Sequence, residues 1–214
     1  MQIEKLILYA VVGIAAAKWA RNEGLLSDPE DQTGSLLDLI PETVEDVQNK
    51  FMTDQIDEQT AAQNVAAFLH VIRIAEGTSQ ESGYRALFGY TPNNGKTFSS
   101  FADHPRQFFL YEDLAGKTIR TSAAGAYQIT ATTYNALCSK YGFAAFTPDV
   151  QDAMALTLID ERGALGDVRA GRFDLALSKV RKVWASLPNS GVNQPTRKIE
   201  QLQAAYLNAG GVFA

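Results

Sequence analysis

Cysteine and histidine are scarce in this chain, whose 214 residues contain one cysteine, Cys138, and two histidines. A single cysteine excludes an intramolecular disulfide, so the core alone must hold the fold. Cys138 follows Tyr134 and Leu137, precedes Tyr141, and has no histidine near it in the sequence. This setting favours a buried structural thiol over a reactive one.

Motifs for metals, phosphates and nucleic acids are also missing. His70 and His104 lie far apart, and neither paired cysteines nor closely spaced histidines provide a zinc-binding pattern. The sequence has no glycine-rich phosphate loop. It also has no basic stripe or helix-turn-helix pattern that would indicate nucleic-acid binding. We therefore expect no metal, no cofactor and no nucleic-acid partner.

A full-length apolar span is absent as well, because the uninterrupted apolar stretch at residues 6–17 has only twelve residues. A transmembrane helix needs about 20 apolar residues, whereas a signal-peptide core has about 7 to 15. Residues 1–24 therefore fit a cleaved export signal, a weakly hydrophobic membrane anchor, or a helix packed against a partner protein. Of these three interpretations we favour a membrane-associated hydrophobic helix.

Charge divides the chain into two parts. Residues 1–60 contain 4 Lys or Arg and 12 Asp or Glu, whereas residues 61–214 contain 15 and 12. The acidic composition of residues 25–60, interrupted by Pro29 and Pro41, indicates a linker with short helices. Residues 61–214 are expected to form one domain, whose slight positive charge suits an anionic polymer.

Periodicity in residues 61–214 indicates a mainly helical domain. Apolar residues recur at spacings of three and four, which predicts helices at 61–75, 126–141, 149–161, 173–186 and 195–209. Between the first two, the stretch at 83–119 differs. Its residues 84–88 and 96–98 flank the turn signal Asn93-Asn94-Gly95, which predicts a small β-hairpin lobe. The predicted fold class is α+β, predominantly α.

Glu76 is the candidate catalytic residue. It follows the apolar helix predicted at 61–75 and is followed at once by Gly77 and Thr78. A carboxyl group that emerges from an apolar face loses hydration, which favours its protonated form near neutral pH. Such a group can serve as a general acid, although the same position also suits a solvated glutamate near a helix end.

Further short blocks accompany Glu-Gly-Thr at 76–78. They are Ser-Ser-Phe-Ala-Asp-His-Pro-Arg at 99–106, Ser-Ala-Ala-Gly-Ala-Tyr-Gln-Ile at 122–129, Glu-Arg-Gly-Ala-Leu at 161–165 and Val-Trp-Ala-Ser-Leu-Pro at 183–188. In order and spacing, residues 67–211 resemble the lambda-type phage endolysins. The resemblance implies a lysozyme-like catalytic domain that acts on peptidoglycan as a lytic transglycosylase, with the hairpin lobe forming one wall of the sugar cleft.

The resemblance also implies that Glu76 performs both proton transfers. In lytic transglycosylases a single Glu protonates the glycosidic oxygen and then accepts the proton of the muramic acid C6 hydroxyl, which closes a 1,6-anhydro ring. The alternative is a hydrolysing muramidase of the same fold. That reaction needs a second carboxylate, about 5 to 5.5 Å or 6.5 to 9.5 Å away, and the candidates are Glu81, Asp103, Glu112 and Asp113.

The block at 122–129 is similar to the Gly-x-x-Gln-Ile pattern of transglycosylases. The resemblance implies that Ser122, Gly125 and Gln128 belong to the sugar-binding site, and a Gln side chain can donate and accept as sugar hydroxyls require. The structural alternative for Gln128 is capping of neighbouring backbone. Tyr127 and Trp184 are candidate platforms for pyranose rings, although a place in the core is the stronger interpretation for Trp184.

The chain departs from the family pattern after Gly83-Tyr84, where Arg85 replaces an expected aspartate. This replacement puts an auxiliary acid in doubt. The planar fork of Arg85 would suit the lactyl or peptide carboxylates of the substrate, and a solvated arginine is the alternative.

A non-enzymatic interpretation also stays open, in which a glycan-binding virion protein is tethered by residues 1–60. The expected partners are peptidoglycan glycan strands, with membrane or virion proteins reached through residues 1–60. The expected location is the host inner membrane or periplasm, or the phage virion, and not the cytoplasm alone. The sequence leaves open whether the enzyme acts in host lysis or in wall penetration by the virion.

Overall fold

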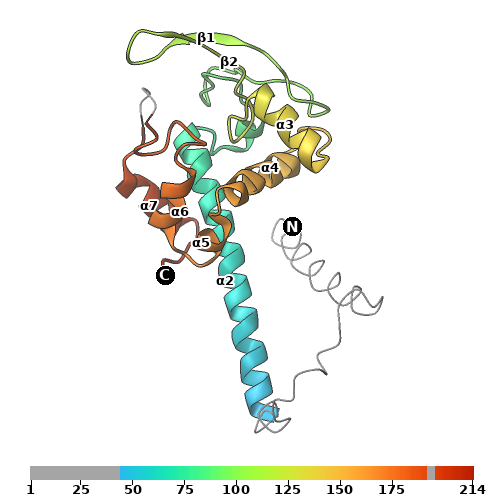
Figure 1. Cartoon of the computed structure of the whole chain (residues 1–214), viewed down its shortest axis with the longest axis vertical. Coiled ribbons are helices and arrows are strands. Elements are labelled where there is room, and N and C mark those ends of the chain that lie inside the picture. Colours follow the sequence, from blue (N-terminus) through green and yellow to red (C-terminus); the bar gives the residue numbers. More distant parts are fainter. Residues whose placement is uncertain (1–43, 192–195) are drawn as a thin grey trace. The chain divides into compact units, whose positions relative to one another are not determined.

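The computed structural model describes residues 44–191 and 196–214 (Figure 1). Side chains are described from residue 57 on. The chain divides into two compact units, residues 1–62 and residues 63–214. The hydrophobic helix predicted at residues 1–24 lies outside the described residues, and so does the predicted linker up to residue 43. None of the helices in the described part has the length and hydropathy that a membrane span requires. The predicted domain limits stay a prediction.

Helix α2 (Val44–Glu76) leads into the second unit. It begins well before the predicted start at residue 61, so the later part of the predicted acidic linker is helical. From Ala67 to its end every side chain is buried or half-buried, with Phe68, Val71 and Ile72 fully enclosed. Burial around most of the circumference is typical of a helix at the centre of a core.

The other helices of the second unit's described part follow in sequence. They are the 3-10 helix η3 (Glu81–Arg85), α3 (Ala131–Tyr141), α4 (Pro148–Glu161), α5 (Leu165–Arg169), α6 (Phe173–Val180) and α7 (Ile199–Asn208). The predicted helices are confirmed with changed limits, and the short α5 was not predicted. α3 begins at Ala131 rather than at 126, because Thr130 caps it by accepting from the Thr133 backbone N–H. α6 ends at Val180 rather than at 186.

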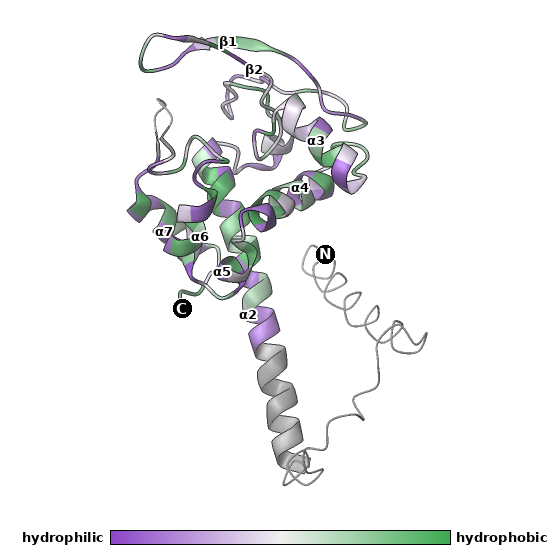
Figure 2. Ribbon diagram, in the orientation of Figure 1, coloured by the Kyte–Doolittle hydropathy of each residue, from purple (hydrophilic) through white to green (hydrophobic). Residues whose placement is uncertain are grey.

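Side chains from α2, α5 and α6 meet in the core. The ring of Phe68 packs edge-on against that of Phe173 in α6, with 5.8 Å between ring centroids. The buried Asn64 side chain donates to the Arg169 carbonyl at 3.1 Å and accepts from the Val212 backbone N–H at 2.7 Å. Hydrophobic residues line this region of the ribbon (Figure 2). The end of α2 is thereby fixed to α5, α6 and the C-terminal segment.

The sheet in the described residues has two antiparallel strands, β1 (Phe109–Glu112) and β2 (Thr118–Thr121). Asp113 closes the turn between them, because its Oδ1 accepts from the backbone N–H groups of Ala115 and Lys117, both at 2.9 Å. The predicted fold class, α+β and predominantly α, is confirmed. The β-hairpin lobe predicted within residues 83–119 is present, but its paired strands lie at 109–121. Around the turn at Asn93-Asn94-Gly95 the predicted arms form one antiparallel bridge, Ala86 with Thr97, and the first arm begins with the end of η3.

Cys138 is half-buried on α3 rather than buried as the sequence indicated. Leu137, its neighbour on the same helix, is the residue that faces the core. The helical rotation of about 100° between adjacent residues separates their environments.

Candidate active site

Glu76 is the last residue of α2, and the chain turns sharply after it. Gly77 has a φ of +74°. Its backbone N–H donates to the Ile74 carbonyl at 3.1 Å, and that of Thr78 donates to the Arg73 carbonyl at 2.8 Å. This pair of hydrogen bonds is the Schellman ending of a helix, in which glycine takes the left-handed position at low cost. The local sequence thus places the Glu76 carboxyl group at a helix end.

Two side chains hold the segment that follows Glu76. The buried Thr78 hydroxyl donates to the Ala126 carbonyl at 2.5 Å, which joins this segment to the loop at 122–129. Arg73 donates to the carbonyls of Ser79 and Gln80 at 3.1 and 2.8 Å. The loop after Glu76 is therefore anchored on both its helix and the neighbouring loop.

The Glu76 side chain is half-buried, and its Oε1 accepts a 2.6 Å hydrogen bond from the Ser186 hydroxyl. Burial raises the pKa of Glu76 from 4.5 to about 7, because the charged form loses hydration, and the Ser186 hydrogen bond opposes this rise by stabilising the carboxylate. A carboxyl group with a pKa near neutrality can donate a proton in one step and accept one in another.

The Gly-x-x-Gln-Ile segment forms a tight loop before α3. Ala124 makes bridges to both Leu87 and Ile129. Gly125 has a φ of +76°, and a Cβ at this position would lie 2.2 Å from the Gln151 Oε1 atom. Both the backbone conformation and the close approach of α4 therefore require glycine here.

Polar side chains of this loop bind backbone groups of the loop and of α3. Gln128 is half-buried with a φ of +47°, and its Nε2 donates to the Gly125 carbonyl at 3.0 Å. This is the backbone-capping role given above as the structural alternative, and contact of Gln128 with a sugar stays a prediction. Ser122 is buried, and its hydroxyl accepts from the Ala131 backbone N–H at 2.9 Å. Ser122 therefore supports the start of α3.

Tyr127 and Trp184 do not present ring faces to a cleft, so their predicted stacking on pyranose rings does not fit this placement. Tyr127 is 1% exposed and Trp184 is 3% exposed. The Trp184 Nε1 donates to the Tyr127 carbonyl at 3.0 Å. The two aromatic residues join the loop at 122–129 to the segment that carries Ser186, and they act as structural support for the site.

Arg85 holds a different loop from the one at 122–129. Its guanidinium group lies over the Phe101 ring, 3.9 Å from the centroid. Nη1 donates to the carbonyls of Phe98 and Ser99 at 3.3 and 2.5 Å. The structure therefore gives Arg85 a role in fixing residues 98–101, and its contact with substrate carboxylates stays a prediction.

Sequence reasoning missed a buried polar network on α4 that supports this site. Asp152 accepts hydrogen bonds from the hydroxyls of Tyr84 and Tyr127 at 2.8 and 2.7 Å. The neighbouring Gln151 is fully buried, accepts from the Ala126 backbone N–H at 2.8 Å and donates to the Tyr84 carbonyl at 3.0 Å. α4 thus fixes η3 and the loop at 122–129 together. No local pattern distinguishes these two residues from surface polar residues.

Ser186 was missed as well, although it lies in the Val-Trp-Ala-Ser-Leu-Pro block. It follows Glu76 by 110 residues in sequence. Its place in a block similar to the endolysins was the one signal that could have drawn attention to it.

The four acids considered as second carboxylates beside Glu76 either make other contacts or are exposed. Asp103 forms an ion pair with Arg106, and Asp113 closes the hairpin turn. Glu81 and Glu112 are exposed. None of these carboxylates contributes to the raised pKa of Glu76.

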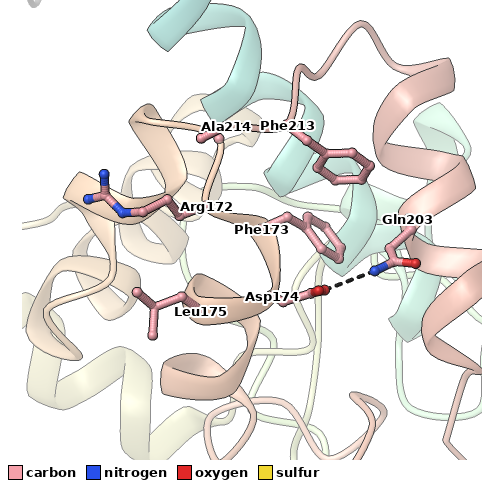
Figure 3. A pocket seen from close by; sticks show the side chains of 8 residues that line it. Arg172, Phe173, Asp174, Leu175, Gln203, Phe213 and Ala214 are labelled. Atoms are coloured by element: carbon pink, nitrogen blue, oxygen red, sulfur yellow. Dashed lines mark hydrogen bonds between the residues drawn. The ribbon is translucent and has the colours of Figure 1, made fainter.

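The described residues contain no group of three or more His, Cys, Asp or Glu side chains arranged to hold a metal ion. A recess of about 340 Å³ lies between the start of α6, α7 and the C-terminal residues. Its walls include Phe173, Leu175 and Phe213 (Figure 3), and the polar Asp174 and Gln203 bind one another at 3.0 Å. None of the predicted site residues lines it.

Comparison with known proteins agrees with this arrangement. The family model described as Endolysin matches residues 66–213. The endolysin of Escherichia phage P2 is 34% identical over 161 residues, which cover 71% of this chain and 96% of that protein. The endolysin of Escherichia phage lambda is 32% identical over 151 residues, which cover 68% of this chain and 90% of that protein.

Solved structures give the same relationship. The lysozyme of bacteriophage lambda in complex with a chitohexasaccharide superposes with a TM-score of 0.62 at 32% identity, covering 71% of this chain and 97% of that one. A second structure of the lambda lysozyme gives a TM-score of 0.60 at 30% identity. The predicted resemblance is thereby confirmed at the level of the family and of the lysozyme-like fold. The chain belongs to the endolysin family, the phage enzymes that degrade peptidoglycan.

Proposed function

We propose that this endolysin is a lytic transglycosylase that cleaves the β-1,4 bond between N-acetylmuramic acid and N-acetylglucosamine, with Glu76 as its single acid and base. One observation carries the proposal. Glu76 is a half-buried carboxyl group at the end of α2 whose Oε1 accepts from the Ser186 hydroxyl, and burial raises its pKa to about 7 without help from a second carboxylate. A carboxylate at the distance used by retaining glycosidases would raise this pKa by repulsion.

In the first step protonated Glu76 gives its proton to the glycosidic oxygen, and the bond from that oxygen to C1 of the muramic acid breaks. The transfer leaves Glu76 as a carboxylate beside the positive charge that develops at C1. The Ser186 hydroxyl stabilises this carboxylate by its 2.6 Å hydrogen bond.

In the second step the Glu76 carboxylate accepts the proton of the C6 hydroxyl, and O6 forms a bond to C1. The product carries a 1,6-anhydro ring, Glu76 is protonated again, and no water is consumed. A group whose pKa lies near the working pH suits both steps, because neither protonation state is costly to reach.

A hydrolysing muramidase is the competing reaction. It needs a second carboxylate to activate water or to form a covalent intermediate. The four candidate acids are engaged elsewhere or exposed, as with the ion pair of Asp103 and the turn of Asp113. This distribution favours the transglycosylase. A purely glycan-binding protein is a weaker alternative, because such a protein has no use for a half-buried acid with a neutral pKa.

Glycan strands are the proposed partner. The lambda lysozyme was solved in complex with a chitohexasaccharide, and this similarity supports a sugar-binding cleft here. We assign substrate contact to the side-chain oxygen of Gln128. Gly125 is buried, its N–H donates to the Ala86 carbonyl at 2.8 Å and its carbonyl accepts from Gln128, so its predicted substrate contact does not fit this placement. Gly125, Ser122, Tyr127 and Trp184 support the loop that carries Gln128.

The test is mass spectrometry of muropeptides released from purified peptidoglycan by the full-length protein. The proposal expects 1,6-anhydromuramyl ends from the wild type and none from Glu76→Gln. The matched control is Glu112→Gln, which makes the same chemical change at an exposed strand position and should retain activity. Reducing ends would establish the hydrolase instead, and no release by the wild type would favour the binding protein.

We also propose that residues 1–24 associate with a membrane and bring the enzyme to the host inner membrane or periplasm, or into the virion. The support is the apolar stretch at residues 6–17. Fractionation of infected cells and purified particles with an antibody tests this. Full-length protein that stays wholly soluble in the cytoplasm would contradict membrane association, and its presence in particles would favour a role in wall penetration.

A further inference from the structure

The hydrogen bond between Ser186 and Glu76 distinguishes the two oxygens of the catalytic carboxyl group. The Ser186 hydroxyl donates to Oε1 at 2.6 Å. In a carboxylic acid the oxygen that accepts a hydrogen bond is the carbonyl oxygen, and the acidic proton belongs to the other oxygen. Oε2 is therefore the oxygen available for proton transfer.

The segment that carries Ser186 is held in place on several sides. The Ser186 carbonyl accepts a hydrogen bond from the Arg197 backbone N–H at 3.1 Å. Two residues before it, the buried Trp184 donates to the Tyr127 carbonyl at 3.0 Å. The next residue, Leu187, is fully buried. The Ser186 hydroxyl thus reaches Glu76 from a fixed backbone, so its position relative to Oε1 does not depend on bound substrate.

Among the described residues, burial and the Ser186 hydroxyl set the pKa of Glu76 without a contribution from a charged side chain. Arg73, one turn earlier on the same helix, is directed to the carbonyls after Thr78 and lies over the Tyr84 ring, 4.4 Å from its centroid. Tyr127 and Trp184 are uncharged at neutral pH. Within the described residues, burial and the Ser186 hydroxyl are the two influences on the pKa of Glu76, and they act in opposite directions.

We propose that Ser186 is a positioning residue for both proton transfers: by occupying Oε1 it makes Oε2 the oxygen that protonates the glycosidic oxygen and later accepts the C6 hydroxyl proton. This inference rests on the proposed transglycosylase function. Ser186 touches neither sugar nor glycosidic bond in this role and acts through Glu76. Its loss therefore affects the rate of chemistry and the pH dependence more than the binding of glycan.

The experiment compares full-length wild type with Ser186→Ala, Ser186→Cys and Ser186→Thr. Initial rates of muropeptide release are measured against peptidoglycan concentration from pH 5 to 9. We expect Ser186→Ala to lower kcat about tenfold with little change in KM, because one charge-assisted hydrogen bond of about 1.5 kcal/mol is lost. The alkaline limb of the pH profile should move to higher pH, since the hydroxyl no longer stabilises the carboxylate. Ser186→Thr keeps the hydroxyl and should restore both properties.

A second measurement does not depend on the reaction. A ¹³C NMR titration of the Glu76 carboxyl carbon in wild type, Ser186→Ala and the nearly isosteric Ser186→Cys reports its pKa directly, with Glu76→Gln used to assign the signal. A higher pKa in the alanine variant supports the inference. An unchanged pKa and an unchanged pH profile would overturn it. If the wild type releases reducing ends, the proposed function fails, and the titration still decides whether Ser186 controls Glu76.

Discussion

Replacing Glu76 by Gln should make the protein more stable at alkaline pH while abolishing its activity. The carboxyl group has a pKa of about 7 in the folded protein against an ordinary value of 4.5, because burial removes its hydration. Gln has nearly the same shape and carries no charge at any pH. Its side-chain oxygen can still accept the hydrogen bond from Ser186.

The magnitude follows from the difference between the two pKa values. One pKa unit is worth about 1.4 kcal/mol, so the charged carboxylate costs the folded state about 3 kcal/mol above pH 7. Below pH 4.5 the folded and unfolded states are both protonated and this cost vanishes. Between these limits the folded state binds more protons, so the free energy of unfolding of the wild type falls as the pH rises through this window.

Urea denaturation of wild type and Glu76→Gln at pH 4, 5.5, 7 and 8 measures the effect. The gain in the free energy of unfolding should be near zero at pH 4 and should rise to about 3 kcal/mol at pH 8. Glu112→Gln, at an exposed position of β1, should show no such trend. An equal gain at every pH, or a variant less stable than wild type at pH 8, would refute the assignment of a buried, neutral-pKa carboxyl to Glu76.

Three further perturbations test the support around the site. Asp152→Ala removes the acceptor of the Tyr84 and Tyr127 hydroxyls and should lower the free energy of unfolding by about 2 to 3 kcal/mol. Asp152→Asn should lower it less, and equal losses in the two variants would argue against the hydrogen bonds. Gly125→Ala adds a Cβ at a left-handed backbone position, close to the buried Gln151 Oε1 atom on α4. The substitution should lower the free energy of unfolding by about 2 kcal/mol or more and reduce muropeptide release. A variant with the wild-type melting temperature would contradict this. Burial lowers the pKa of His104, so the folded state resists protonation and the free energy of unfolding should fall as the pH drops below about 6.5. In His104→Gln the change in melting temperature between pH 7 and 5 should be smaller than in the wild type.

Features that depend on neighbouring residues could be read from the sequence. The helix before Glu76, the glycine after it and the position of the carboxyl group at the helix end all follow from apolar spacing and backbone preference, which act over a few residues. The predominantly helical class followed from the same periodicity. The limits of α3 and α6 were less well predicted, because Thr130 and the turn after Val180 override helical propensity locally.

The position of the hairpin shows where local signals become ambiguous. The chain has turn residues at Asn94-Gly95 and again at Asp113 and Gly116. Both turns form, and Asn94 accepts from the Thr91 and Lys96 backbone N–H groups. The first turn is flanked by one antiparallel bridge, Ala86 with Thr97, and the second by two strands of four residues each. Strand pairing depends on the side-chain contacts that each strand finds, which turn chemistry does not specify.

The roles of individual site residues required the tertiary structure. The sequence by itself identified Glu76 as an acid at the end of an apolar helix, because desolvation and helix termination are local consequences of composition. Only the fold brought Ser186 to 2.6 Å from that carboxyl group, buried Trp184 and Tyr127 behind it, and placed Asp152 between two tyrosine hydroxyls. These contacts join segments far apart in the chain, and packing of the whole domain decides which polar groups meet.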